Sequence, residues 1–180
     1  MESFKTQDTD NSIAQISTIG DDADTLENLQ IRLNAVRIPE NSNDVEETLD
    51  FFVEYSEREA PPVPIVVGLL DSLINILEKP ELLTPHSLSC LWSLLGSYGE
   101  YFHPNTDFQR VFNVLLSFSQ EDSPYSIIST ILTGSSKAAD EFMNNKALKT
   151  ILANEDVEIG DKVALISAIS SHKELIPSIK

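Results

Sequence analysis

The sequence predicts an all-α fold in which helix pairs of similar construction stack side by side. The first observation is an apolar pattern that recurs with a spacing of 37 residues. Its members are Leu91, Leu94 and Leu95, then Ile128, Ile131 and Leu132, then Leu165, Ala168 and Ile169. A second predicted helix obeys the same spacing, through Ile74 and Leu77, then Val111 and Val114, then Leu148 and Ile151. Two helical segments that share one spacing indicate repeats that bury their apolar faces against their neighbours.

The N-terminal part divides into a tail and a helix pair. Residues 1–22 are rich in Asp, Ser and Thr. We expect a disordered acidic tail there, because it holds too little apolar surface to offset the entropy of ordering. Residues 23–60 contain two predicted helices that do not follow the 37-residue spacing, which indicates a divergent first repeat or a cap.

Each helix of this pair has a start signal and an apolar face. Asp24 is the expected N-cap of the first helix, which runs to about Val36. Asn43 is the expected N-cap of the second helix, with Glu46 as its capping-box partner. The expected buried faces are Leu26, Leu29, Leu33 and Val36 on the first helix, and Val45, Leu49, Phe52 and Val53 on the second.

Residues 61–180 hold the predicted repeats, and the proline-rich segment 60–64 before them is a candidate hinge. Residues 63–67 are rich in β-branched side chains but continue into helical spacing, so no strand is predicted. The predicted helix that begins in this segment ends after Leu77, because helical conformation is disfavoured for the residue before a proline, here Pro80. Thr84-Pro85 predicts the next helix start, since the hydroxyl caps and proline suits the first helical position.

Five further helices are expected towards the C-terminus, at residues 108–115, 127–132 after a Ser123-Pro124 start, 136–143, 146–153 and 157–170. The inward faces expected for the last two are Leu148, Ile151 and Leu152, then Ile159, Val163, Ile166 and Ile169. The stretch 171–180 opens another repeat beyond the chain end, or forms a closing amphipathic helix or an oligomer contact.

The segment 147–159, Ala-Leu-Lys-Thr-Ile-Leu-Ala-Asn-Glu-Asp-Val-Glu-Ile, followed by the Ala/Leu-rich residues 162–169, resembles armadillo and HEAT repeats. Residues 115–132 are similar one repeat earlier. Asn145-Lys146 stands where armadillo repeats commonly have glycine, and the spacing is short for armadillo, so HEAT is the nearer likeness. The resemblance covers about residues 63–180 and implies a right-handed superhelical stack of HEAT/armadillo-like helical repeats.

Within that superfamily, residues 122–135 and the following Glu141-Phe142-Met143-Asn144-Asn145 are similar in rhythm to the HEAT-repeat chaperones that assemble the proteasome regulatory particle. That resemblance implies a protein that holds the C-terminal domain of an ATPase subunit during assembly and has no catalytic residues.

The net charge indicates which classes of partner the chain can bind. The net charge is −17 over 180 residues, so the chain repels nucleic-acid phosphates and favours a protein partner with a basic surface. Acidity that serves only solubility is the alternative. We expect no membrane contact, because there is neither an apolar signal nor a stretch of about 20 apolar residues. One cysteine, Cys90, excludes an internal disulfide and favours the cytoplasm or nucleus.

The sequence offers little chemistry. No glycine-rich phosphate loop precedes a lysine, so no nucleotide cofactor is expected. His86 and Cys90 lie four residues apart and could form a base–nucleophile pair. A buried apolar thiol beside a surface histidine is the preferred interpretation, because Cys90 falls among apolar helix positions. Three histidines and one cysteine scattered along the chain predict no metal site. Trp92 and Tyr98 are expected to be core residues rather than a ligand box.

The polar side chains on the leucine-rich helices are the candidate binding residues. In armadillo and HEAT folds these helices line a concave groove, so the resemblance places a partner there. The candidates are Asp71, Asn75, Arg110, Asn113, Ser117 and Lys149, which otherwise are simply solvated helix positions.

The sequence thus predicts a non-enzymatic protein-binding scaffold, adaptor or assembly chaperone. The alternatives are a regulator or exchange factor of an ATPase or GTPase, which needs different affinities for two states of its target, and a structural subunit of a larger complex. A hydrolase that uses His86 and Cys90 is a further alternative.

Overall fold

The computed structural model describes residues 26–39, 41–118 and 124–172, and these residues form nine α-helices and two short 3-10 turns with no strand. The all-α prediction is therefore confirmed for this part of the chain. The helices are α1 (Leu26–Arg37), α2 (Ser42–Arg58), α3 (Val63–Leu77), α4 (Pro85–Tyr98), α5 (Phe108–Ser117), α6 (Tyr125–Gly134), α7 (Ser136–Asn144), α8 (Lys146–Ala153) and α9 (Ile159–Ser170). The turns are η1 (Pro80–Leu82) and η2 (Gly99–Tyr101).

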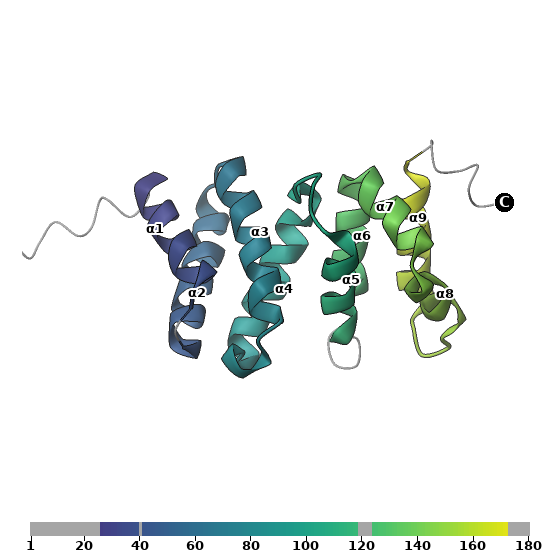
Figure 1. The fold of residues 1–180 in the computed structure, drawn as a ribbon, viewed down its shortest axis with the longest axis horizontal. Coiled ribbons are helices and arrows are strands. Elements are labelled where there is room, and N and C mark those ends of the chain that lie inside the picture. Colours follow the sequence, from purple (N-terminus) through teal and green to yellow (C-terminus); the bar gives the residue numbers. More distant parts are fainter. Residues whose placement is uncertain (1–25, 40, 119–123, 173–180) are drawn as a thin grey trace, which may run out of the picture.

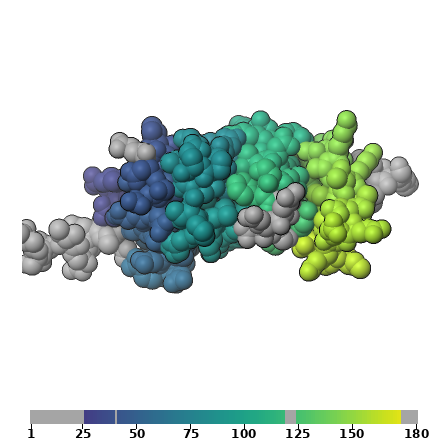
Figure 2. Space-filling view, turned by 90° about the horizontal axis from the view of Figure 1, so that it is seen from below, coloured from purple at the N-terminus to yellow at the C-terminus, as the bar shows by residue number. Residues whose placement is uncertain are grey.

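The helices form two layers that follow chain order along an elongated molecule (Figures 1 and 2). In the first layer, α1 packs on α3, α3 on α5 and α5 on α7, with α8 against α7. In the second layer, α2 packs on α4, α4 on α6 and α6 on α9. From α1 to α7, each helix therefore lies beside the helix two places away in chain order, whereas α6 packs on α9 and α8 packs on its immediate neighbour α7.

The core runs continuously between the two layers. All nine positions of the first 37-residue pattern, on α4, α6 and α9, are buried. In the second pattern Ile74, Leu77, Val111 and Ile151 are buried, whereas Val114 and Leu148 are half-buried against the core. The first pattern is thus buried in all three of its helices, and the second pattern is buried at four of its six positions. Burial of each fully buried Leu, Ile or Val side chain among them contributes about 1.5–3 kcal/mol to folding.

The helix starts follow local capping chemistry. At α4 the amide of Ser87 donates to Thr84 Oγ1 and the amide of Thr84 donates to Ser87 Oγ, which closes a capping box. Pro85 stands at the first helical position, as predicted. The cap expected for α2 is wrong by two residues: Asn41, not Asn43, accepts from the amide of Asp44. The other two predicted caps, Asp24 and Ser123, lie outside the described residues.

Four of the expected apolar faces need correction. Leu26 and Leu152 are exposed, and Val53 is only half-buried. The largest error is on α9, where Ile159, Val163 and Ile166 are 79%, 59% and 48% exposed. The buried face of α9 instead consists of Leu165, Ala168 and Ile169. The helix packs on α6 and α7. The 37-residue pattern identified this face correctly, whereas the helical periodicity of the segment alone did not.

Two glycines permit close packing. A Cβ on Gly68 of α3 would lie 2.9 Å from Leu33 Cδ2 of α1. A Cβ on Gly134, at the end of α6, would lie 2.5 Å from Glu100 Cα in η2. At Gly134 the close atoms are backbone, so the approach of α6 to η2 depends on the missing side chain, whereas at Gly68 the end of the Leu33 side chain would have to shift.

Other predictions for the chain ends lie outside the described residues, namely the acidic tail at 1–22 and the segment 173–180. The N-terminal helix pair is present as α1 and α2 and packs directly on α3 and α4. Across the described residues, no helix is long and apolar enough to span a bilayer.

Candidate functional site

Two groups of polar side chains stand out on this scaffold, one in each layer. The first joins α3 to α5 and includes residues expected from the sequence. Arg110 Nη2 donates to Asn75 Oδ1 at 2.6 Å. The same guanidinium forms a two-pronged ion pair with Glu78, with Nε 2.7 Å from Oε1 and Nη2 2.6 Å from Oε2. Glu78, the C-cap residue of α3, was not among the expected residues.

Glu78 and Arg110 shift each other's pKa. The hydrogen bonds from Arg110 lower the pKa of Glu78 below its ordinary value of 4.5. The hydrogen bonds to Glu78 in turn raise the pKa of Arg110, and the charges of Glu78, Asp107 and Asp71 add to this effect. The charges of three carboxylates therefore act on one cation, and this negative balance favours a cationic ligand.

A shallow hollow lies beside this group. It measures about 520 Å³, and Asn113 and Ser117 form its polar side. The rest of its lining is mainly apolar and consists of Leu77, Glu78, Pro80, Val114 and Phe118. Charged groups next to a small apolar depression are typical of surfaces that receive an anchoring side chain from a partner.

Five of the six expected binding residues therefore lie on α3 and α5. Asp71 and Asn75 are on α3, and Arg110, Asn113 and Ser117 are on α5. Lys149 is exposed on α8 and is not among the residues that line the hollow. The sequence could have indicated Glu78, since it lies three residues after Asn75 and so falls on the same side of its helix.

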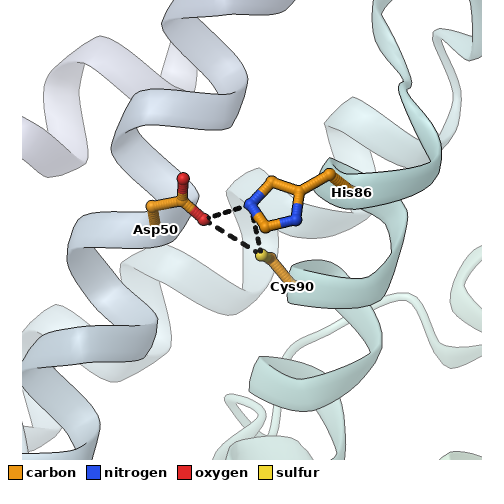
Figure 3. A group of neighbouring side chains, drawn as sticks. All are labelled: Asp50, His86 and Cys90. Atoms are coloured by element: carbon orange, nitrogen blue, oxygen red, sulfur yellow. Dashed lines mark hydrogen bonds and ion pairs between the residues drawn. The ribbon is translucent and has the colours of Figure 1, made fainter.

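The second group lies in the other layer, between α2 and α4 (Figure 3). Asp50 projects from α2, and His86 and Cys90 project from successive turns of α4. Asp50 Oδ1 lies 2.7 Å from His86 Nε2 and 3.3 Å from Cys90 Sγ, and the two α4 atoms are 3.9 Å apart. Three chemically different donor atoms thus converge on one point.

The environment keeps the Cys90 thiol protonated. Burial is the largest cause, followed by the hydrogen bond to Asp50 and then by the negative charges of Asp50 and Glu46. Together they raise the pKa of Cys90 to about 11. A protonated thiol is a poor nucleophile, because the thiolate is the reacting form.

The arrangement also differs from a nucleophile–base–acid triad. In a triad, the nucleophile and the acid meet different nitrogens of the histidine ring. Here Cys90 Sγ and Asp50 Oδ1 both face Nε2. The predicted burial of Cys90 and exposure of His86 are confirmed. Asp50 was missed, because only the packing of α2 on α4 brings it to the pair.

Trp92 and Tyr98 were expected to be core residues, and both are only partly buried. Trp92 is half-buried, with its ring edge-on to that of Phe118 at 5.7 Å. Its buried Nε1 finds no hydrogen-bond acceptor among the described residues. The hydroxyl of Tyr98 donates to Ser56 Oγ at 2.8 Å, which links α4 to α2. These contacts make both residues part of the helix packing.

No family model, curated protein or solved structure matches the chain. The functional argument therefore stands on the geometry of these two groups.

Proposed function

We propose that the chain is a HEAT/armadillo-like helical-repeat protein that binds a partner protein through the surface formed by α3 and α5. It would act as a scaffold, adaptor or assembly chaperone and would not catalyse a reaction. The observation that carries the proposal is the hollow between α3 and α5, with the Arg110, Asn75 and Glu78 side chains beside it.

The repeat assignment rests on packing that recurs. The pattern on α4, α6 and α9 is buried in all three helices, and each helix packs on the next. Helical stacks of this kind expose long surfaces that are used to bind other macromolecules.

The chemistry of the surface suits a partner segment with one apolar and one basic side chain. The apolar side chain would enter the hollow against Leu77, Val114 and Phe118. The basic side chain would approach Glu78 and Asp71, whose combined charge exceeds that of Arg110. The overall charge of −17 would speed the encounter with such a partner.

The experiment is affinity purification with the intact chain and with two variants. Both variants replace a serine by arginine, so the two changes are equal in size and charge. Ser117→Arg places a long cation at the hollow, and Ser93→Arg places the same cation at an exposed position of α4 in the other layer. We expect a partner that is retained by the unchanged chain and by Ser93→Arg, and at least tenfold depleted with Ser117→Arg. A partner retained equally by all three proteins would contradict the proposal.

A further inference from the structure

We propose that Asp50, His86 and Cys90 form a binding site for one divalent transition-metal ion of the zinc class, held between α2 and α4. The inference is independent of the proposed function, because it concerns the other helix layer and residues that do not line the α3–α5 hollow.

The spacing of the three donor atoms suits such an ion. The circle that passes through points separated by 2.7, 3.3 and 3.9 Å has a radius of about 2.0 Å. Zinc binds nitrogen and oxygen at about 2.0–2.2 Å and thiolate sulfur at about 2.3 Å. One ion placed slightly above the plane of the three atoms therefore reaches all of them at nearly correct distances.

The donor types select the ion. A thiolate and an imidazole favour zinc, cobalt and related ions, whereas magnesium and calcium prefer sites made of oxygen alone. When Cys90 is deprotonated, the three side chains carry two negative charges, which balance a divalent cation. His86 and Cys90 are four positions apart, so both project from one side of α4.

Asp50 Oδ1 already joins the other two ligands, since His86 and Cys90 both meet it within hydrogen-bond distance. An entering ion replaces the protons of these hydrogen bonds. The thiol proton passes to solvent, and sulfur donates an electron pair to the metal. The imidazole donates its Nε2 electron pair and carries its proton on Nδ1.

An ion can enter the site from solvent, and the ligand side chains can adjust their positions to it. The His86 and Asp50 side chains are 57% and 42% exposed, so an ion reaches them from solvent. A tetrahedral site needs about 3.3 Å between nitrogen and oxygen, and these exposed side chains can move apart to that distance. The fourth position then faces water, as in zinc sites with three protein ligands.

Glu46 adds negative charge nearby. It lies one turn before Asp50 on α2, and its charge acts on Cys90. Its Oε2 accepts a hydrogen bond from Thr84 Oγ1 at 2.7 Å, which fixes it against the start of α4. A carboxylate held next to the site adds negative charge that attracts a divalent cation.

The test is direct titration of the purified full chain with Zn²⁺ and, separately, with Co²⁺. We expect one ion per chain with micromolar or tighter affinity, and a near-ultraviolet thiolate-to-cobalt charge-transfer band. Zinc should also raise the melting temperature, because the ion binds α2 and α4 together only in the folded state. Mg²⁺ should produce neither effect.

The variants are Cys90→Ser, His86→Gln and Asp50→Asn, with His103→Asn as the control at an exposed histidine outside the group. We expect Cys90→Ser to abolish the band, and His86→Gln and Asp50→Asn to weaken zinc binding at least tenfold. His103→Asn should bind as the unchanged chain does. The last two ligand changes are at side chains with large exposed fractions, so they keep the test valid if Cys90→Ser perturbs folding. Absence of zinc binding, a cobalt complex without the thiolate band, or equal affinity in the ligand variants and the control would overturn the proposal.

Discussion

Arg110 of α5 and Glu78 at the end of α3 form a two-pronged ion pair, with nitrogen-to-oxygen distances of 2.7 and 2.6 Å. The pair joins neighbouring helices of one layer at the edge of the hollow, and it also orients the guanidinium towards Asn75. Its two side chains are 43% and 40% exposed, so water screens much of its energy and we expect at most about 1 kcal/mol from it.

This ion pair predicts a pH dependence. Because Arg110 lowers the pKa of Glu78, the stabilisation is present above the ordinary value of 4.5 and is lost as the pH falls through the lowered pKa. Glu78→Gln should therefore lower the free energy of unfolding at neutral pH, and should reduce it little under acidic conditions where Glu78 is protonated. Urea unfolding of both proteins across the acidic range measures this. Glu81→Gln, at an exposed position of η1, is the control. An unchanged difference between Glu78→Gln and the parent at low pH would contradict the prediction.

Neighbouring positions on α9 test which face of the last helix is buried. Leu165 is fully buried and Ile166 is 48% exposed. Leu165→Ala should cost about 2–5 kcal/mol, since it removes core contacts and leaves a cavity. Ile166→Ala should change stability by no more than about 0.5 kcal/mol. Chemical unfolding of the two variants decides the matter, and equal losses would mean that the helix is rotated from the orientation described.

Gly134 and Gly96 form a second matched pair. Alanine at Gly134 would place its Cβ within 2.6 Å of both Glu100 Cα and the Glu100 carbonyl oxygen, so the backbone would have to shift. We expect a loss of about 1–3 kcal/mol. Alanine at Gly96 meets nothing within 4 Å and should stabilise α4 by about 0.5–1 kcal/mol. Melting temperatures that move in opposite directions would agree with this packing, whereas a tolerated Gly134→Ala would not.

The Cys90 thiol should react slowly with alkylating reagents. Its pKa is raised from 9.0 to about 11, so the thiolate fraction near neutral pH falls about 100-fold. Asp50→Asn should speed alkylation, because it removes a charge that disfavours the thiolate. Rates measured against pH with a chelator present give the pKa directly. Glu57→Gln, exposed on α2, should leave the rate unchanged. A rate profile with its midpoint near 9.0 would contradict the prediction.

The same shift has a consequence for stability at high pH. The folded state holds the thiol proton more tightly than the unfolded state, so the unfolded chain ionises first as the pH rises. Stability should therefore fall between pH 9.0 and about 11, and Cys90→Ser should remove this part of the fall. An equally steep fall in the Cys90→Ser variant would assign the dependence to other groups.

Local sequence was sufficient for the helices and for most of their inward faces. Thr84-Pro85 identified the start of α4, and Leu33 and Leu49 were assigned correctly to the core. Such predictions succeed because helical periodicity and capping depend on residues within a few positions of one another. The Asn43 error shows the limit, since Asn41 offers the same side chain two residues earlier and the backbone selects between them.

The sequence by itself determined that this chain is helical and, through its 37-residue pattern, which positions of α4, α6 and α9 are buried. Only the tertiary structure decided that the Ile159, Val163 and Ile166 stripe of α9 faces outward, and that Asp50 meets His86 and Cys90. A single amphipathic segment can offer two apolar stripes, and the choice between them depends on the neighbouring helices. Contacts between residues 36 and 40 positions apart depend on how one helix is rotated and shifted against another, which long-range packing sets and local spacing does not encode.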